Sequence, residues 1–154
     1  MSRIRRADPA DRDLLAPHFE SFFREDAIAF EPTVLRANLA AMLSDDRAAI
    51  WIAITDDDVV MGFASATLTR GVEMGLIAEI EDLYVLPGFR RQGLARQLLE
   101  AAIAWAEAQG AQEQFVVITP EAEAEQGLTR FYARYGFSLS DRLAMFRSAV
   151  GPAP

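Results

Sequence analysis

A turn rich in glycine and arginine, "LPGFRRQGLA" (86–95), is the stretch of this sequence best suited to binding an anion. It joins a strand-like run, "IAEIEDLYV" (77–85), to a helix-like run, "RQLLEAAIAWAEAQG" (96–110). The first amide groups of a helix have no intrahelical partner, and glycine lets a ligand approach the main chain closely. Arginine side chains pair readily with phosphate oxygens. The joint therefore predicts a site for a phosphate-bearing ligand.

Two carboxylates, Glu79 and Glu81, precede this turn in the strand-like run. Regular alternation would place them on one face of the strand together with Leu83 and Val85. A carboxylate in an apolar central strand costs free energy unless it is solvated or paired. Both residues are therefore candidates for acid–base chemistry. The alternative is that one or both only bind an arginine or line a wet cleft.

The elements that must position these residues follow from the hydrophobic periodicity of the chain. The pattern predicts the order strand, helix, helix, three strands, helix, strand, helix and strand. Residues 1–150 are predicted to form one domain, and residues 151–154 a loose tail. The predicted strands are 2–6, 48–55, 59–69, 75–86, 114–119 and one around 142–148; the predicted helices are 9–25, 32–43, 94–109 and one near 126–135.

Two motifs, together with this order of elements, resemble a known family. The segment 90–95 reads R-x-x-G-x-A and follows L-x-V-x-P at 83–87, while "FYARYGF" (131–137) places a tyrosine four residues before a Gly-Phe pair. The chain thereby resembles the GNAT superfamily of N-acetyltransferases, whose acetyl-CoA motif is written [QR]-x-x-G-x-[GA]. The resemblance implies the GNAT fold, an α/β (α+β) architecture with a mixed, mostly antiparallel central sheet flanked by helices. Neither G-x-x-x-x-G-K-[ST] nor G-x-G-x-x-G is present, which disfavours the common nucleotide-binding loops.

By this resemblance, acetyl-CoA is the co-substrate. The strand end would contact the acetyl and pantetheine arm through its main chain, and the amides of the turn would bind the pyrophosphate. Glu125 stands where the family often has an asparagine that contacts CoA, and a contact at this position is left open. The implied cofactor-binding residues are Leu83, Tyr84, Val85, Arg90, Arg91, Gln92, Gly93, Leu94, Ala95 and Glu125.

The resemblance also implies catalytic roles. An amine is protonated at neutral pH, so a base must remove a proton before attack, and an acid should protonate the leaving thiolate. Glu81 occupies the position of the general base in the polyamine-acetylating branch, and Glu79 is the second candidate. Tyr132 matches the tyrosine whose hydroxyl points at the CoA sulfur; the alternative is a core aromatic. The chain has no cysteine to carry an acetyl group, which favours direct transfer in a ternary complex.

Composition limits the other classes of function. The net charge of −8 repels nucleic acids and favours small cationic molecules. With no cysteine and His18 as the single histidine, no metal site is expected. The sequence shows neither a signal-like apolar region nor a run long enough to span a bilayer, so no membrane partner and a cytoplasmic location are expected. The acceptor side is weakly specified: its candidates, Phe23, Asp26, Phe30 and Glu31, could equally be core and surface residues.

The sequence thus predicts an acyltransferase, of the kind that transfers groups other than aminoacyl groups, acting on a primary amine of a small, cationic metabolite or drug-like molecule. A protein lysine or N-terminal acetyltransferase and a non-catalytic CoA-binding sensor are the alternatives. Homodimers are common in the family, and the apolar residues Leu143, Met145 and Phe146 of the predicted last strand would suit such an interface.

Overall fold

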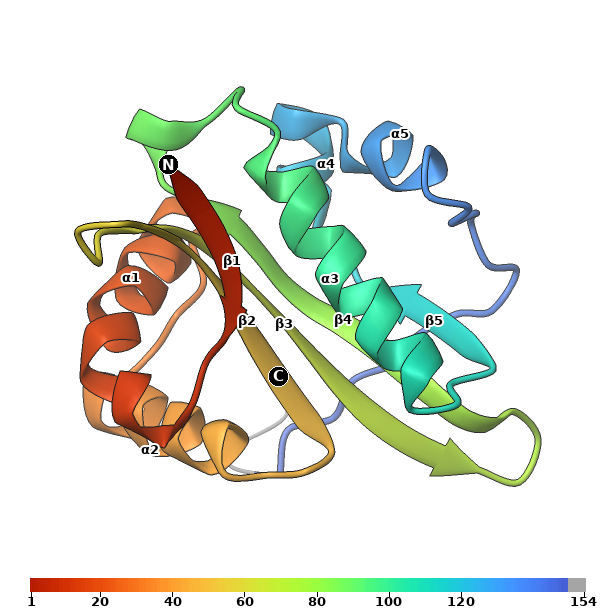
Figure 1. Cartoon of the computed structure of the whole chain (residues 1–154). Helices are drawn as coiled ribbons and strands as arrows, with labels where there is room; N and C mark the ends of the chain where they lie inside the picture. Colours follow the sequence, from red (N-terminus) through yellow and green to blue (C-terminus); the bar gives the residue numbers. More distant parts are fainter. Residues whose placement is uncertain (150–154) are drawn as a thin grey trace. The chain divides into compact units, whose positions relative to one another are not determined.

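The computed structural model of the protein describes residues 1–149 and has two compact units, residues 1–117 and the chain from Ile118 onward (Figure 1). The first unit contains the sheet and three long helices. The second contains two short helices. A single acetyltransferase domain over residues 1–150 stays a prediction, and the predicted tail at 151–154 lies outside the described residues.

The first unit is built on a five-stranded sheet in the order β1-β2-β3-β4-β5. The four strands β1 to β4 pair in antiparallel fashion, and β5 joins β4 in parallel. This confirms the predicted mixed, mostly antiparallel sheet. The strands are β1 (Ser2–Arg6), β2 (Ala48–Thr55), β3 (Val60–Gly71), β4 (Gly75–Val85) and β5 (Glu113–Val116).

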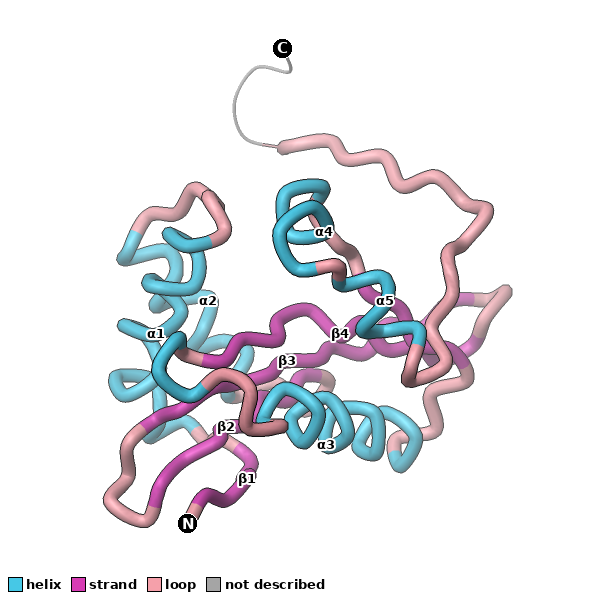
Figure 2. Tube along the Cα trace, turned by 90° about the horizontal axis from the view of Figure 1, so that it is seen from above, coloured by secondary structure: helices cyan, strands magenta, loops and turns pink. Residues whose placement is uncertain are grey.

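Helices cover both faces of this sheet (Figures 1 and 2). On one face, α1 (Arg12–Glu25) and α2 (Pro32–Leu43) bury a cluster of apolar side chains against the strands. On the other face lies α3 (Leu94–Ala108), whose Trp105 ring contacts Trp51 of β2 at 5.6 Å between centroids. The central members of the first cluster are Leu15, Phe19, Phe22, Leu39, Ile50, Ile52, Phe63 and Tyr84.

In the second unit, α4 (Pro120–Gln126) and α5 (Leu128–Ala133) meet at Gly127, whose φ of 61° suits glycine. The predicted strand 114–119 is shorter, because Thr119 caps α4: its hydroxyl accepts the amide of Ala122 at 3.2 Å. The predicted helix near 126–135 corresponds to α5.

The predicted last strand around 142–148 is wrong for this structure, in which residues 134–149 contain neither helix nor strand. A strand needs a neighbour to pair its main-chain groups and to cover its apolar side chains. Here Leu143 and Met145 are each 95% exposed, and Phe146 is 86% exposed. The apolar pattern is present in the sequence, but among the described residues no strand of the sheet extends to this segment.

Candidate active site

A β-bulge in β4 sets the geometry of the carboxylates. Ser65 of β3 is opposite Asp82, whereas the next residue, Ala66, is opposite Ile80, so Glu81 is the extra residue. The Thr67 hydroxyl donates to Glu81 Oε1 at 2.9 Å, and Thr67 is itself opposite Glu79. Glu79 and Glu81 therefore share a face, as expected.

The bulge overturns the rest of the expected alternation. The Ser65 hydroxyl donates to Asp82 Oδ2 at 2.5 Å, and Ser65 and Thr67 lie on the same side of β3 because they are two residues apart. Asp82 thus joins Glu79 and Glu81 on this face. Leu83 and Val85, expected beside the two glutamates, are shifted to the opposite face because the extra residue changes the phase of the strand.

Asp82 is the functional candidate that sequence reasoning missed. Burial raises the pKa of Asp82 to about 6, and the charges of Glu81 and Glu79 act in the same direction, against the hydrogen bond from Ser65. Part of the residue still reaches the surface. Burial, and then the charge of Glu81, also raise the pKa of Glu79. The face can therefore attract a cation and offers a carboxylate of unusual basicity for proton transfer.

The partner strand β5 covers only part of β4. It pairs Glu113–Val116 with Ile77–Ile80, and among residues 1–149 no strand continues this edge along Glu81–Val85. An extended molecule lying beside that edge would meet main-chain groups. The predicted contacts of Leu83, Tyr84 and Val85 with the pantetheine arm fit this edge and stay predictions.

The turn between β4 and α3 has the backbone of an anion site. A short 3₁₀ turn (Pro87–Phe89) leads to Arg91 with a φ of 63° and to Gly93 with a φ of 78°. Gly93 is the N-cap of α3 and has no side chain with which to satisfy the first amides of the helix. Left-handed residues before a helix N-terminus create a concave row of N–H groups that favours anions.

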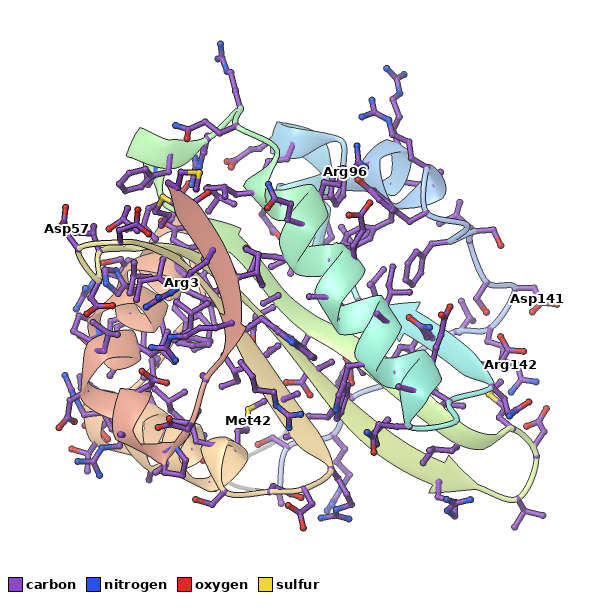
Figure 3. The ribbon with its side chains drawn as sticks, in the orientation of Figure 1. Arg3, Met42, Asp57, Arg96, Asp141 and Arg142 are labelled. Atoms are coloured by element: carbon purple, nitrogen blue, oxygen red, sulfur yellow. The ribbon has the colours of Figure 1, made fainter. Side chains whose placement is uncertain are left out.

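Side chains around this turn leave its outer surface polar. Arg91 and Gln92 are exposed, Leu94 is buried as an anchor, and Ala95 is half-buried. Arg96, on the first turn of α3 (Figure 3), pairs with Glu100 at 2.8 Å. Positions 90–95, all among those predicted to bind the cofactor, therefore run continuously from the turn into the start of α3, and their contact with acetyl-CoA stays a prediction.

Arg90 differs from its neighbours because its guanidinium is engaged within the protein. Its Nε donates to the Val85 carbonyl at 2.8 Å, and its Nη2 donates to Glu25 Oε1 at 2.6 Å. Glu25, the last residue of α1, was not a sequence candidate. The sequence shows only that Glu25 lies at the end of an amphipathic helix, and this position gives no sign of its contact with Arg90.

The remaining catalytic candidate, Tyr132, belongs to the second unit. Its side chain is buried, and its ring lies 5.2 Å from Phe131 and 5.5 Å from Phe137, measured between centroids. Glu125 is exposed on α4. The roles of both residues stay predictions.

The acceptor candidates of the first unit have clear structural roles. Phe23 and Phe30 are partly buried against the core cluster and contact each other at 6.0 Å between centroids. The Glu31 carboxylate accepts the amide of Val34 and caps α2. Burial lowers the pKa of the half-buried His18. Asp26 ends α1 as its C-cap.

Residues 1–149 contain no group of three or more histidine, cysteine, aspartate or glutamate side chains placed to hold a metal ion. In the same part of the chain, every helix is too short or too polar to cross a membrane.

Comparisons with known proteins agree with this geometry. The profile of the acetyltransferase (GNAT) family matches residues 12–137. An aminoglycoside N(6')-acetyltransferase type 1 of Salmonella typhimurium is 30% identical over 110 residues, which cover 69% of this chain and 73% of the relative.

Two solved structures have the same fold. Aminoglycoside N-acetyltransferase AAC(6')-Iy in complex with CoA superposes with a TM-score of 0.79 at 23% identity, over 97% of this chain and 96% of that one. The aminoglycoside acetyltransferase meta-AAC0020, from an uncultured soil metagenomic sample and in complex with sisomicin, gives a TM-score of 0.74 at 18% identity, over 97% of each chain.

Fold, turn and sequence matches together define an N-acetyltransferase, which is an acyltransferase. The chain belongs to the GNAT family of acetyltransferases, and the resemblance carried by its two motifs is thereby confirmed.

Proposed function

We propose that the protein transfers the acetyl group of acetyl-CoA directly to a primary amine of a small polycationic acceptor of the aminoglycoside type. The observation that carries this proposal is the set of three carboxylates, Glu79, Glu81 and Asp82, on one face of β4, just before the anion-binding turn. A cationic acceptor is attracted by such a face and by a net charge of −8. The aminoglycoside acetyltransferases among its relatives support the same class of acceptor.

The chemistry then needs three proton transfers. A carboxylate of β4 removes a proton from the acceptor ammonium, and the nitrogen lone pair forms a bond to the acetyl carbonyl carbon. The carbon–sulfur bond breaks, and CoA leaves as a thiolate that takes a proton from the Tyr132 hydroxyl. The nitrogen gives up its second proton, which reprotonates the Tyr132 phenolate through water and leaves a neutral amide. Because its pKa of about 6 keeps Asp82 ionised yet basic near neutral pH, we assign it as the base. Glu81 and Glu79 remain the alternatives for this step.

The test measures thiol release from acetyl-CoA with a panel of aminoglycosides, polyamines and basic peptides. The protein contributes no thiol of its own, since it lacks cysteine. We expect Asp82→Asn to lower kcat by about 100-fold or more, and Tyr132→Phe to lower it by a similar factor. Glu81→Gln and Glu79→Gln are the matched variants and should raise KM for the amine more than they lower kcat.

Several outcomes would contradict these assignments. If Glu81→Gln abolished turnover and Asp82→Asn did not, Glu81 would be the base. Acetylation of peptides alone would favour a protein acetyltransferase, and CoA binding without turnover on any amine would favour a sensor.

The same proposal includes a homodimer in the cytoplasm. Four large apolar side chains, Leu139, Leu143, Met145 and Phe146, are at least 84% exposed, and a second copy would remove such surface from water. Sedimentation of the protein and of a Met145→Ser/Phe146→Ser variant measures the oligomeric state. A cytoplasmic location fits the proposed use of acetyl-CoA and is checked by cell fractionation.

A further inference from the structure

A single carboxylate connects α1 to both halves of the predicted acetyl-CoA site. Glu25, the last residue of α1, accepts a hydrogen bond from the Tyr84 hydroxyl at 2.6 Å on Oε2 and one from Arg90 Nη2 at 2.6 Å on Oε1. Tyr84 lies at the end of β4, and Arg90 lies in the turn before α3. Glu25 therefore connects the strand and the turn to α1, which itself supplies no residue to the predicted acetyl-CoA site.

The guanidinium of Arg90 is held by three groups. Besides Glu25, it donates through Nε to the Val85 carbonyl at 2.8 Å and lies with Cζ 5.5 Å from the centre of the Tyr84 ring. Neither the Arg90 nor the Glu25 side chain is fully exposed, at 43% and 35% of their surfaces. These contacts hold the Arg90 guanidinium in place, so that Arg90 can stabilise the conformation of residues 90–95, a role that we call a brace.

At neutral pH, the protonation states of Glu25 and Tyr84 both favour the hydrogen bonds of the Glu25 carboxylate. Burial alone would raise the pKa of Glu25, but the hydrogen bonds from Tyr84 and Arg90 outweigh it and lower this pKa. Burial, followed by the bond to Glu25, raises the pKa of Tyr84 to about 12. The carboxylate is thus ionised and the phenol protonated near pH 7, so both hydrogen bonds persist there.

The residues that follow Arg90 need such support. Arg91 has a φ of 63°, a left-handed conformation that is uncommon for a residue with a side chain, and Gly93 has a φ of 78°. A turn held in this conformation before the ligand arrives loses less conformational entropy on binding, and this raises affinity.

We propose that Glu25 is a positioning residue for acetyl-CoA. Through Arg90 it holds the turn 90–95 in the conformation that presents main-chain amides to the pyrophosphate. This inference rests on the proposed placement of the pyrophosphate on that turn. It assigns to Arg90 an internal structural bond in place of a direct bond to phosphate.

The two roles of Arg90 predict opposite results for one variant. If Arg90 braces the turn, Glu25→Gln weakens CoA binding about tenfold, because a charge-assisted hydrogen bond is lost. If Arg90 binds phosphate directly, Glu25→Gln releases its guanidinium, and CoA binds equally well or more tightly. Calorimetry with CoA gives the dissociation constant for both cases, and an unchanged or tighter constant would overturn the proposal.

A double-mutant cycle sharpens this result. Arg90→Gln should weaken CoA binding by the same factor of about ten as Glu25→Gln, and the double variant should show about tenfold weakening in place of a hundredfold, since both changes remove one contact. Independent, multiplying effects would contradict the brace. Tyr84→Phe keeps the ion pair and should change the dissociation constant less than threefold, in line with a single hydrogen bond.

Controls separate the inference from loss of fold and from the placement of CoA. Asp45→Asn removes an exposed pair with Arg47 and should leave CoA binding unchanged. Ultraviolet titration of the phenol should show for Tyr84 in Glu25→Gln a pKa that is lower than about 12 but still above its ordinary value, because burial, the larger cause, persists as long as the protein is folded. If Gly93→Asp leaves CoA binding intact, the pyrophosphate placement fails; if only Glu25→Gln has no effect, the brace alone fails.

Discussion

The N-termini of α2 and α3 solve the same problem in two ways. Each helix begins with amides that have no intrahelical acceptor. At α2, the Glu31 carboxylate accepts the Val34 amide at 2.9 Å, and Pro32 contributes no amide at all. At α3, the capping position is Gly93, which offers no acceptor, and the residue two before it adopts a left-handed φ. One end is satisfied from within the chain, and at the other we propose that a ligand supplies the acceptor.

The difference teaches that the negative charge at a helix N-terminus can come either from the chain itself or from a ligand. Hydrogen bonds from the amides of Val34 and Thr33 lower the pKa of Glu31, so that a negative charge faces the positive end of α2 at neutral pH. At α3, the proposed pyrophosphate would bring the same charge from outside.

The largest effect is expected when the α3 end is made to resemble the α2 end. Gly93→Asp places a carboxylate at the capping position, and aspartate tolerates the left-handed conformation. We expect the dissociation constant for CoA to rise at least about 100-fold, because the new charge competes for two amides and repels phosphate. Gly93→Asn is the matched neutral control and should lose clearly less affinity. Equal losses in the two variants would show that backbone strain, not occupancy of the amides, is responsible.

An intermediate effect is expected from the charge beside the α3 end. Arg91→Gln removes an exposed guanidinium next to the amides, and we expect CoA to bind about tenfold more weakly, as for one charge-assisted contact. The loss should shrink at high salt, because exposed charges are screened. Arg12→Gln, at another exposed arginine, is the control. A salt-independent loss would instead indicate a change in the conformation of the turn.

The smallest effect is expected when the α2 end is opened. Glu31→Ala should lower the Tm by roughly 2–4 °C, the usual loss for one helix cap in a chain of this size, and leave CoA affinity unchanged. Since the folded pKa of Glu31 is lowered, its stabilisation is fully present above its ordinary pKa and is lost as the pH falls through the lowered value. Scanning calorimetry at pH 7 and pH 3 checks this: the difference in Tm should shrink at pH 3.

The turn and the order of the elements as far as β5 were predictable because their signals are local. A glycine at a left-handed position, a proline after a strand and an apolar helical stripe are each read within a few residues. The bulge is not local, because it arises from pairing with Ser65, far along the chain from Asp82. For that reason the sequence shows that Glu81 and Asp82 are neighbours, but it does not show that Asp82 shares a face of β4 with Glu79 and Glu81.

Two other residues show the same limit. Arg90 fills the first position of a phosphate-binding motif, and its sequence context gave no sign of its bond to Glu25, which is 65 residues away. Phe146 lies in an apolar run that predicted a strand, yet strand formation depends on a partner edge. Periodicity identifies the apolar side chains that burial would stabilise; it does not identify the residues that would cover them.

The extra residue in β4 decides where this strand can lose a residue. Deleting Glu81 would restore regular pairing with Asp82 still opposite Ser65 and Ile80 still opposite Ala66, so Glu79 and Asp82 would keep their shared face. Deleting Leu83 would instead leave the bulge in place and shift the pairing of the residues that follow, which would turn Tyr84 and Val85 to the other face. The strand should therefore tolerate the loss of its bulged residue far better than a deletion at a regularly paired position.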